Sequence, residues 1–456
     1  MEIHVDTVTI RSAALLAGRT KLTCLLLSSL LLLFGGWAPA EAGSVLQVTK
    51  TQDTNDGVCD SDCSLREAIL AANANPGPDT IALPVGRFTL TIPGSDEDFC
   101  ATGDLDILGA SVSITGQGPL LSIVDASGLG DRVFDVDADS AATVNLEALT
   151  VARGNCSQHG GGIYHNQGQL VLDNVVLRDN QSAAIGGGIY CSLGDLTVQG
   201  GSVIRDNSCS TQWYGGGIAG AHVTIIDSTV SGNLGGSGGG IANYFSGGTT
   251  TITGSTIAYN QTENYDGGGI YSEGSTITIS NSTFVGNYSG RVGGAIFAGA
   301  AATVTLHSVT VSGNDSSTGD SLRVSSSGTM VLTNSLISGS CHNDGGTFSS
   351  SGGNLESPGN TCSLVGPGDD VNVADPMLGP LTTNGGPTMT RAPLLGSPAI
   401  DSGTDTACLS LDQRGKARSD GFCDVGSVER QATDQDPLFF DGFETGDTGA
   451  WSSHTP

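Results

Sequence analysis

Residues 267–287 read GGGIYSEGSTITISNSTFVGN, and this stretch contains the two signatures that decide the fold. The first is a run of glycines that ends in an isoleucine, here Ile270. The second is an apolar residue three places before an asparagine, here Asn287. Between them threonine and isoleucine alternate over 276–279, which is the period of a β-strand with one buried face. Both signatures recur along the chain, so this stretch is one unit of a repeat.

The repeat has an almost constant period. Its asparagines are separated by 27, 26, 27, 27 and 27 residues, and they are Asn180, Asn207, Asn233, Asn260, Asn287 and Asn314. Such regularity indicates supersecondary units that stack on one another, and the β-branched, glycine-punctuated composition excludes helical repeats. The sequence therefore predicts an all-β, single-stranded right-handed parallel β-helix. Each coil of about 27 residues is expected to contain three short strands and three turns.

Repeated positions have predictable physical roles in such a solenoid. Two apolar columns are expected to point inward, namely Leu177, Ile204, Val230, Ile257, Phe284 and Val311, and Ile163, Ile189, Ile218, Ile241, Ile270 and Ile296. Asparagines at a shared turn tolerate left-handed backbone geometry and can hydrogen-bond along the stack. The asparagine and glycine columns are therefore interpreted as structural.

The amino terminus has the pattern of an export signal. Basic residues precede an apolar run over 22–34, and Ala40-Glu41-Ala42 provides the small residues of a cleavage site. The run is too short to span a bilayer, and no later stretch is long enough, so no transmembrane segment is expected. Residues 1–42 are predicted to be a signal peptide, and the mature chain is expected to begin near Gly43.

The mature chain is expected to have four parts. Residues 43–142 form an amino-terminal cap and the first coils, and 143–340 form the β-helix repeats. Residues 341–429 contain the carboxy-terminal coils, and 430–456 are an acidic tail. Ser64-Leu65-Arg66-Glu67 is a capping box that predicts a short amphipathic helix over the first coil, where strand edges would otherwise be exposed.

Cysteine content supports export. Of eleven cysteines, only Cys24 falls in the signal segment, and the even number that remains suggests disulfides in an exported protein. Near neighbours that could pair locally are Cys59 with Cys63, Cys341 with Cys362, and Cys408 with Cys423. Partners cannot be read from the sequence for Cys100, Cys156, Cys191 and Cys209. No cysteine has the spacing of a zinc site.

Net charge limits the partners. Acidic residues number 46 against 17 basic ones, which gives a formal charge of -29 and makes nucleic acid an unfavourable partner. Acidic polysaccharide would need a bridging divalent cation. The acidic loop from Asp53 to Asp62 has its glycine one place early for an EF-hand, so calcium is considered but not assigned. No cofactor and no metal ligand set are predicted.

Three stretches resemble known families. Residues 60–69, DSDCSLREAI, resemble the CSLREA motif at the start of exported bacterial parallel β-helix proteins. The Phe284-Val285-Gly286-Asn287 and 293–296 segments are similar to the FxxN and GGAI repeats of chlamydial polymorphic outer-membrane proteins. Segments resembling the choice-of-anchor Q domain are 375–381, 384–387, 396–401, 412–415 and 424–429. The resemblance implies a β-helix that is secreted or held at the outer surface of a Gram-negative-type bacterium, and it transfers no catalytic residue.

The leading functional hypothesis is a non-catalytic adhesin that binds a glycan or another cell-surface ligand. Its candidate binding residues are Trp213, Tyr214, Tyr265 and Tyr288, which all lie between the asparagine column and the next glycine corner. Aromatic faces spaced by multiples of about 4.8 Å along a solenoid could stack on successive sugars. The same rings could also shield turn backbone or fill the core.

Two other hypotheses stay open. A polysaccharide lyase or glycoside hydrolase of the pectate-lyase-like type needs acidic residues that hold calcium beside a strong base, or two carboxylates that face one cleft. The nearest constellation is Arg178-Asp179 with Arg205-Asp206, at the same phase of consecutive coils, and surface ion pairing explains it equally well. An inert structural spacer would need no site at all.

Overall fold

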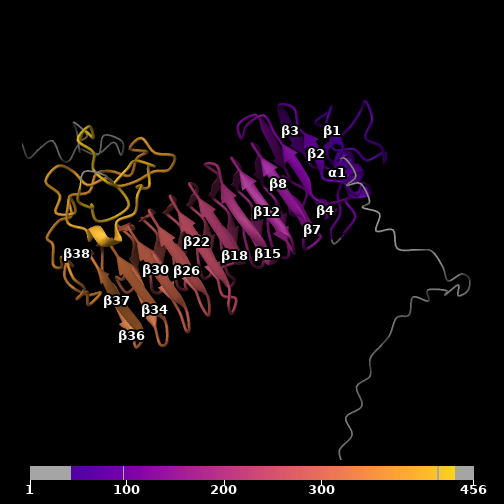
Figure 1. Ribbon diagram of the computed structural model, residues 1–456. Coiled ribbons are helices and arrows are strands. Elements are labelled where there is room, and N and C mark those ends of the chain that lie inside the picture. Colours follow the sequence, from indigo (N-terminus) through magenta and orange to yellow (C-terminus); the bar gives the residue numbers. More distant parts are fainter. Residues whose placement is uncertain (1–42, 96, 419–420, 437–456) are drawn as a thin grey trace, which may run out of the picture. The chain divides into compact units, whose positions relative to one another are not determined.

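The computed structural model describes residues 43–95, 97–418 and 421–436. Within these residues the chain winds into a solenoid whose strands pair in parallel within three sheets of 20, 11 and 7 strands, here called sheets A, B and C. The strands of sheet A lie side by side in the order of the coils (Figure 1). The predicted right-handed parallel β-helix is confirmed. The predicted signal peptide and most of the acidic tail lie outside the described residues.

Sheet A contributes two strands to most coils. Its strands are β1 (Val45–Gln47), β2 (Asp79–Ala82), β4 (Leu105–Gly109), β5 (Val112–Thr115), β7 (Phe134–Ala138), β8 (Thr143–Glu147), β11 (Ile163–His165), β12 (Gln169–Asp173), β15 (Ile189–Gln199), β18 (Ile218–Ile226), β21 (Ile241–Asn243), β22 (Thr249–Thr253), β25 (Ile270–Ser272), β26 (Thr276–Ser280), β29 (Ile296–Ala298), β30 (Thr303–His307), β33 (Leu322–Ser325), β34 (Thr329–Thr333), β36 (Cys341–Asp344) and β37 (Thr347–Gly352).

Sheets B and C contribute one strand each. Sheet B consists of β3 (Gly86–Thr89), β6 (Ser122–Asp125), β9 (Thr150–Ala152), β13 (Val176–Arg178), β16 (Val203–Arg205), β19 (Thr229–Ser231), β23 (Thr256–Ala258), β27 (Thr283–Val285), β31 (Thr310–Ser312), β35 (Leu336–Ser338) and β38 (Leu355–Ser357). Sheet C consists of β10 (Asn155–Cys156), β14 (Gln181–Ser182), β17 (Ser208–Cys209), β20 (Leu234–Gly235), β24 (Gln261–Thr262), β28 (Tyr288–Ser289) and β32 (Asp315–Ser316). A complete coil thus has four strands where the sequence predicted three, because a two-residue strand is too short to show alternation.

The interior of the solenoid is filled by the two predicted apolar columns. All twelve of their side chains are fully buried, from Leu177 to Val311 in one column and from Ile163 to Ile296 in the other. Each such aliphatic side chain contributes about 1.5 to 3 kcal/mol relative to exposure. Because neighbouring coils pair in constant register, for example Ile257 with Phe284, the columns form one continuous core.

A ladder of buried asparagines runs along the corner between sheets B and C. The Nδ2 atom of each asparagine donates to Oδ1 of the next, as from Asn233 to Asn260 at 2.9 Å. The backbone N–H of Asn233 donates to the same oxygen at 3.1 Å. The left-handed residue at this corner is the one before the asparagine, such as Tyr259 with φ 55° or Gly286 with φ 64°. The asparagines are therefore selected for their hydrogen bonds rather than for positive φ.

A helix covers the amino-terminal end of the stack, as the capping box predicted. Helix α1 (Leu65–Ala74) begins after Ser64, whose Oγ accepts from the N–H of Glu67 at 3.1 Å, while Glu67 accepts from the N–H of Ser64 at 2.7 Å. Arg66 is fully buried, and its Nε donates to Asp53 at 2.8 Å. Asp53 of the acidic loop is thus part of the bond network that fixes the helix to the first coils.

The three disulfides that the sequence suggested are all present, and they join Cys59 to Cys63, Cys341 to Cys362, and Cys408 to Cys423. The cysteines whose partners could not be read are buried free thiols. Within the described residues, no helix has the length and apolar character needed to cross a membrane.

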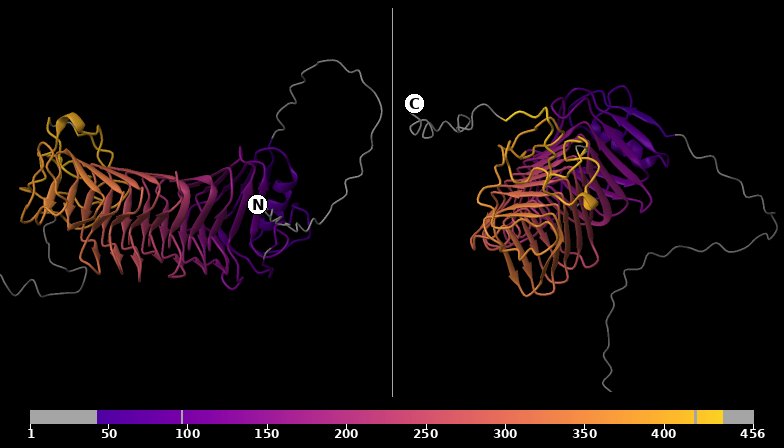
Figure 2. Two further views of the ribbon diagram at one scale, coloured as in Figure 1. Left: turned by 90° about the horizontal axis from the view of Figure 1, so that it is seen from below. Right: turned by 60° about the vertical axis from the view of Figure 1, so that its left-hand side comes forward.

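After β38 the chain leaves the solenoid and returns along the outer face of sheet B, with a 3-10 helix at Asp405–Ala407 (Figure 2). Hydrogen bonds join it to four successive coils, namely Thr388 Oγ1 to Gly254 O at 2.7 Å, Asn281 Nδ2 to Leu411 O at 2.8 Å, Ser427 N to Thr310 Oγ1 at 2.9 Å, and Thr404 N to Asn334 Oδ1 at 2.7 Å. This segment, here called the return segment (residues 378–430), covers the carboxy-terminal half of sheet B.

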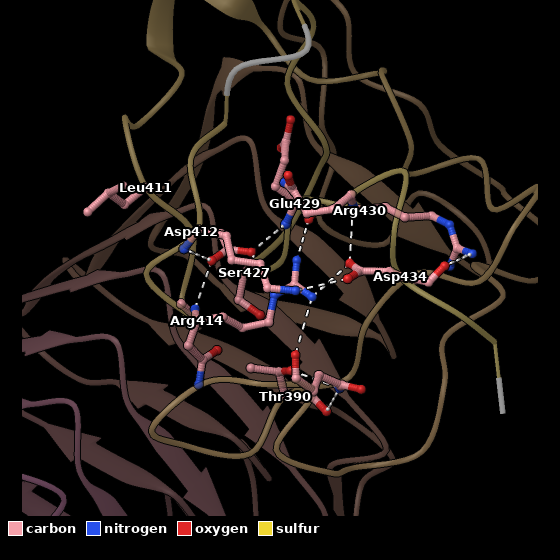
Figure 3. Close-up of polar contacts among 12 residues, drawn as sticks. Thr390, Leu411, Asp412, Arg414, Ser427, Glu429, Arg430 and Asp434 are labelled. Atoms are coloured by element: carbon pink, nitrogen blue, oxygen red, sulfur yellow. Dashed lines mark hydrogen bonds and ion pairs between the residues drawn. The ribbon is translucent and has the colours of Figure 1, made fainter.

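Two of the anchor-like motifs hold the return segment together. Arg414 lies at the centre of the network in Figure 3, where its Nε donates to Asp412 at 2.9 Å and its Nη1 pairs with Asp434 at 2.7 Å. Asp412 also accepts from the backbone N–H of Glu429 at 3.1 Å. The neighbouring Gln413 is 2 % exposed and donates to Ser255 O of the solenoid at 3.1 Å. These motif residues therefore have a structural role in docking.

Candidate functional site

One outward-facing row of side chains follows the first strand of each coil in sheet A. The pairing register aligns Asp106, Asp135, Tyr164, Tyr190, Ala219, Ala242, Tyr271, Phe297, Arg323 and His342. The row changes from acidic at its amino-terminal end to aromatic in the middle and basic at the other end. The row combines carboxylates with rings, and the sequence repeat does not predict it.

The aromatic part of this row is a packed stack. The rings of Tyr271 and Phe297 are stacked with centroids 5.3 Å apart, and Tyr164 lies 5.7 Å from Tyr190. Two small residues, Ala219 and Ala242, separate Tyr190 from Tyr271 in the row. A sequence signal for the row does exist, because Gly-Gly-Gly-Ile-Tyr occurs at 160–164, 186–190 and 267–271.

The four predicted binding rings do not form one platform. Trp213, Tyr265 and Tyr288 are 43 %, 41 % and 39 % exposed, as a binding role requires. Within the described part of the chain no ring contact joins these three. Tyr214 instead packs beside the aromatic row, where its ring lies 5.6 Å from that of Tyr271 and stacks on Tyr244 at 4.3 Å. Adjacent residues in a turn can point to different faces, which the linear spacing does not reveal.

A pocket lies at the acidic end of the row. Its volume is about 400 Å³, and it is lined by Asp98, Phe99, Asp106, Leu108, Asp135, Asp137, Tyr164 and Asn166. Phe99 is 71 % exposed at the rim, and Asn166 Nδ2 donates to Asp137 Oδ1 at 2.8 Å. We call these residues the acidic pocket. The coils that contain Asp106 and Asp135 carry neither repeat signature, so no pattern in the sequence predicts the register that brings these two residues together.

Three carboxyl groups are crowded beside this pocket, and two of them, Asp106 and Asp135, line it. Oxygen atoms of Asp104, Asp106 and Asp135 all lie within 4.8 Å of one another. Burial, followed by the charges of neighbouring aspartates, raises the pKa of Asp104 to about 9. Burial likewise raises the pKa of Asp106 to about 7, and that of Asp135 to about 6 against the opposing charge of Arg132. At neutral pH the cluster therefore retains protons.

This arrangement permits two kinds of chemistry. Carboxylate oxygens are the ligands that calcium prefers, so the three aspartates could hold a cation in place of their protons. Alternatively, a mixture of protonated and ionised carboxyls can donate to and accept from the hydroxyls of a ligand. Arg132 lies beside the cluster, with Nη1 3.4 Å from Asp104 and its guanidinium 5.3 Å from the Tyr164 ring centroid.

The crowding predicts how stability depends on pH. The unfolded Asp106 carboxyl releases its proton near pH 4, whereas the folded one keeps it until about pH 7, so rising pH destabilises the fold across this interval. Asp106→Asn removes the titrating group and should raise the melting temperature at pH 8, with almost no gain at pH 4. Asp139→Asn, at an exposed carboxyl that does not line the pocket, is the control. An equal rise in melting temperature at both pH values would contradict a raised pKa of Asp106.

The arginine constellation of the enzymatic hypothesis lies on sheet B. Arg178 and Arg205 are register partners, and each pairs with the aspartate that follows it. The Arg205 and Asp206 side chains are 42 % and 48 % exposed, which is the environment of a weak surface ion pair. Surface pairing accounts for these residues without a catalytic role.

A second pocket, of about 260 Å³, lies in the return segment beside Arg414 and Arg430. The chain itself supplies the countercharges there, since Arg414 pairs with Asp434, and Arg430 pairs with Asp436 at 2.8 Å. Both arginines are thereby neutralised within the protein, and the acidic pocket remains the stronger candidate site.

No protein-family model matches the chain, and no curated protein matches it. A search of solved structures finds the crystal structure of pectate lyase Pel9A, with a TM-score of 0.48 and 14 % sequence identity. The match covers 86 % of this chain and 98 % of that chain.

Proposed function

We propose that the chain is an exported, non-catalytic glycan-binding protein, and that it binds sugar in the acidic pocket. One observation carries the proposal: an exposed aromatic ring and several hydrogen-bond acceptors line the same pocket. The ring is that of Phe99, and the acceptors are the carboxyl groups of Asp106, Asp135 and Asp137. The three disulfides support export, because such bonds persist in oxidising compartments.

The pocket chemistry suits a neutral sugar. The C–H face of a pyranose packs on an aromatic ring, and its hydroxyls donate to carboxylates. A uronate would meet the clustered carboxyls of Asp104, Asp106 and Asp135 and would be repelled unless a cation intervened. The formal charge of -29 also repels an anionic sugar. We therefore infer a neutral glycan as ligand.

Phe99→Ala should weaken glycan binding in a glycan array and in titrations with the best ligand. Loss of a stacking ring removes on the order of 1 kcal/mol, which corresponds to roughly fivefold weaker affinity. Stability should hardly change, because the ring is mostly exposed. Phe422→Ala is the matched control, since Phe422 is 61 % exposed and lines no part of the pocket.

Trp213→Ala belongs in the same experiment, because it tests the ring corner that the sequence suggested. Weaker binding in Trp213→Ala with unchanged binding in Phe99→Ala would move the site from the acidic pocket to that corner. Equal affinity of all variants, or absence of glycan binding by the unaltered chain, would reject the proposal.

Hydrolysis of a glycosidic bond is the second candidate function. Asp106 and Asp135 have raised pKa values of about 7 and about 6, so one can retain a proton at neutral pH while the other is ionised. Their oxygens lie within 4.8 Å, close to the separation of about 5 to 5.5 Å in retaining glycosidases. Release of reducing ends by the unaltered chain, abolished in Asp106→Asn, would establish this activity, and binding without turnover would exclude it.

A further inference from the structure

A regular grid of threonines covers the outer face of the second strand column in sheet A. The strands β22, β26 and β30 lie side by side (Figure 1), and each places two threonines outward. We call the grid the threonine array, and its members are Thr249, Thr251, Thr276, Thr278, Thr303 and Thr305. Their neighbours Ile277 and Ile279 point inward and are fully buried, so the strand alternation forces the threonines outward.

Two rows of the array continue beyond its centre. Pairing register extends the first row to Thr329 and Thr347, and the second row back to Thr224 and Thr197. Each row therefore has five threonines on consecutive coils. In earlier coils the positions of the first row carry His222, Asp195, Gln169 and Thr143, so the unbroken run of threonines in that row begins at Thr249.

β-Propensity explains why threonine is tolerated here, but it does not select this pattern. Valine, isoleucine and aromatic residues satisfy an outward strand position equally well. The array instead combines one hydroxyl and one methyl at every position, and it holds no charged residue in a chain with a formal charge of -29. It is thus an electrically neutral strip on a strongly acidic protein.

Five of the six hydroxyls of the array are unused by the described residues, and the sixth, Thr249 Oγ1, shares a hydrogen bond with His222 Nδ1 at 3.0 Å. Thr251, Thr276, Thr278, Thr303 and Thr305 have no side-chain hydrogen bond within the described residues. The comparable threonine row on sheet B is occupied, because Thr256 Oγ1 donates to Met389 O at 2.5 Å, and Thr283 Oγ1 to Gln413 at 2.6 Å. One threonine row of this solenoid binds the return segment, whereas the array faces solvent.

We propose that the threonine array binds ice. Along the stack its hydroxyls repeat at about 4.8 Å, and along each strand at about 6.7 Å, because parallel strands fix both spacings. The repeat along the stack lies close to an oxygen repeat of hexagonal ice. Threonine is stiff at χ1, so hydroxyls in equivalent positions share one direction and can hold waters in lattice order. The methyls beside them favour ordered water over mobile water.

Rigidity makes the match effective. The array sits on a sheet whose other face is the continuous apolar core, with Ile277, Ile279, Val304 and Leu306 fully buried beneath it. A surface that is already ordered loses little conformational entropy on binding a crystal. The inference does not depend on the proposed glycan site, because the two sites share no residue.

Slow growth of ice from a solution of the purified chain tests the inference, with thermal hysteresis measured on the same samples. The unaltered chain should enter the ice and lower its growth temperature. Thr278→Lys places a hydrated charge at the centre of the array and should lose most of both effects. Thr383→Lys makes the same change at an exposed threonine of the return segment and should retain them. Phe99→Ala should also retain them.

Thr303→Lys is a second variant of the array, so the test does not rest on the folding of Thr278→Lys alone. Both variants should have the melting temperature of the unaltered chain. Exclusion of the unaltered chain from ice would overturn the inference. So would equal behaviour of Thr278→Lys and Thr383→Lys. If Thr278→Lys instead lost glycan binding while no variant entered ice, the array would belong to a sugar site.

Discussion

Ile257→Asp is expected to remove several kcal/mol from the free energy of unfolding. Ile257 is fully buried in β23 between Val230 and Phe284 of the inward column, so the new carboxylate would have neither water nor a cationic partner. Because adjacent coils share this column, the damage should spread to the coils on both sides rather than stay local. Chemical denaturation followed by circular dichroism gives the measurement.

Gln261→Asp is the matched control, because it introduces the same charge at an exposed position of the same coil. Its stability should lie within about 0.5 kcal/mol of the unaltered chain. If Ile257→Asp and Gln261→Asp had the same free energy of unfolding, the column would not face the core.

Asn260→Ala should be nearly as damaging, although it removes only a small polar side chain. Its Oδ1 accepts from both the backbone N–H and the Nδ2 of Asn233, at 3.1 and 2.9 Å. Its own Nδ2 donates to Val230 O at 2.9 Å and to Asn287 at 2.9 Å. Alanine would leave buried donors and a buried carbonyl without partners, each at a cost of about 1 to 3 kcal/mol.

Asn343→Ala removes an exposed asparagine and should leave the melting temperature almost unchanged. The double variant Asn233→Ala with Asn260→Ala should be less damaging than the sum of the single changes, because the two side chains share bonds. Strict additivity would argue that the ladder contributes as isolated residues rather than as a connected chain.

The sequence predicted those features whose cause lies within one coil or between residues that are close in the chain. Ile257 and Asn260 could be placed because the same contact recurs every coil, so that one period determines many positions. The helix after Ser64 could be predicted because both partners of its capping box are three residues apart. Cys341 and Cys362 form a disulfide across 21 residues, a separation that the sequence already suggested.

Features that depend on register between irregular coils could not be predicted. Asp106 and Asp135 become neighbours only when β4 pairs with β7, and no repeat signature sets that register. Tyr214 was grouped with Trp213 because the two are adjacent in the sequence, yet the turn directs its ring to Tyr244. The contact between Gln413 and Ser255 joins residues that are 158 positions apart, so no local pattern indicates it.

The return segment also determines where this protein can gain or lose coils. Its hydrogen bonds join it to residues from Gly254 to Asn334. The length of the segment therefore has to match the length of the carboxy-terminal half of the stack. Duplication of one coil within 256–334 would pull those residues apart by a strand spacing and break the match. Duplication within 163–250 would only lengthen the stack, since every coil there presents the same ladder and core to its neighbour. Evolution by whole-coil duplication is therefore permitted in one half of the solenoid and opposed in the other.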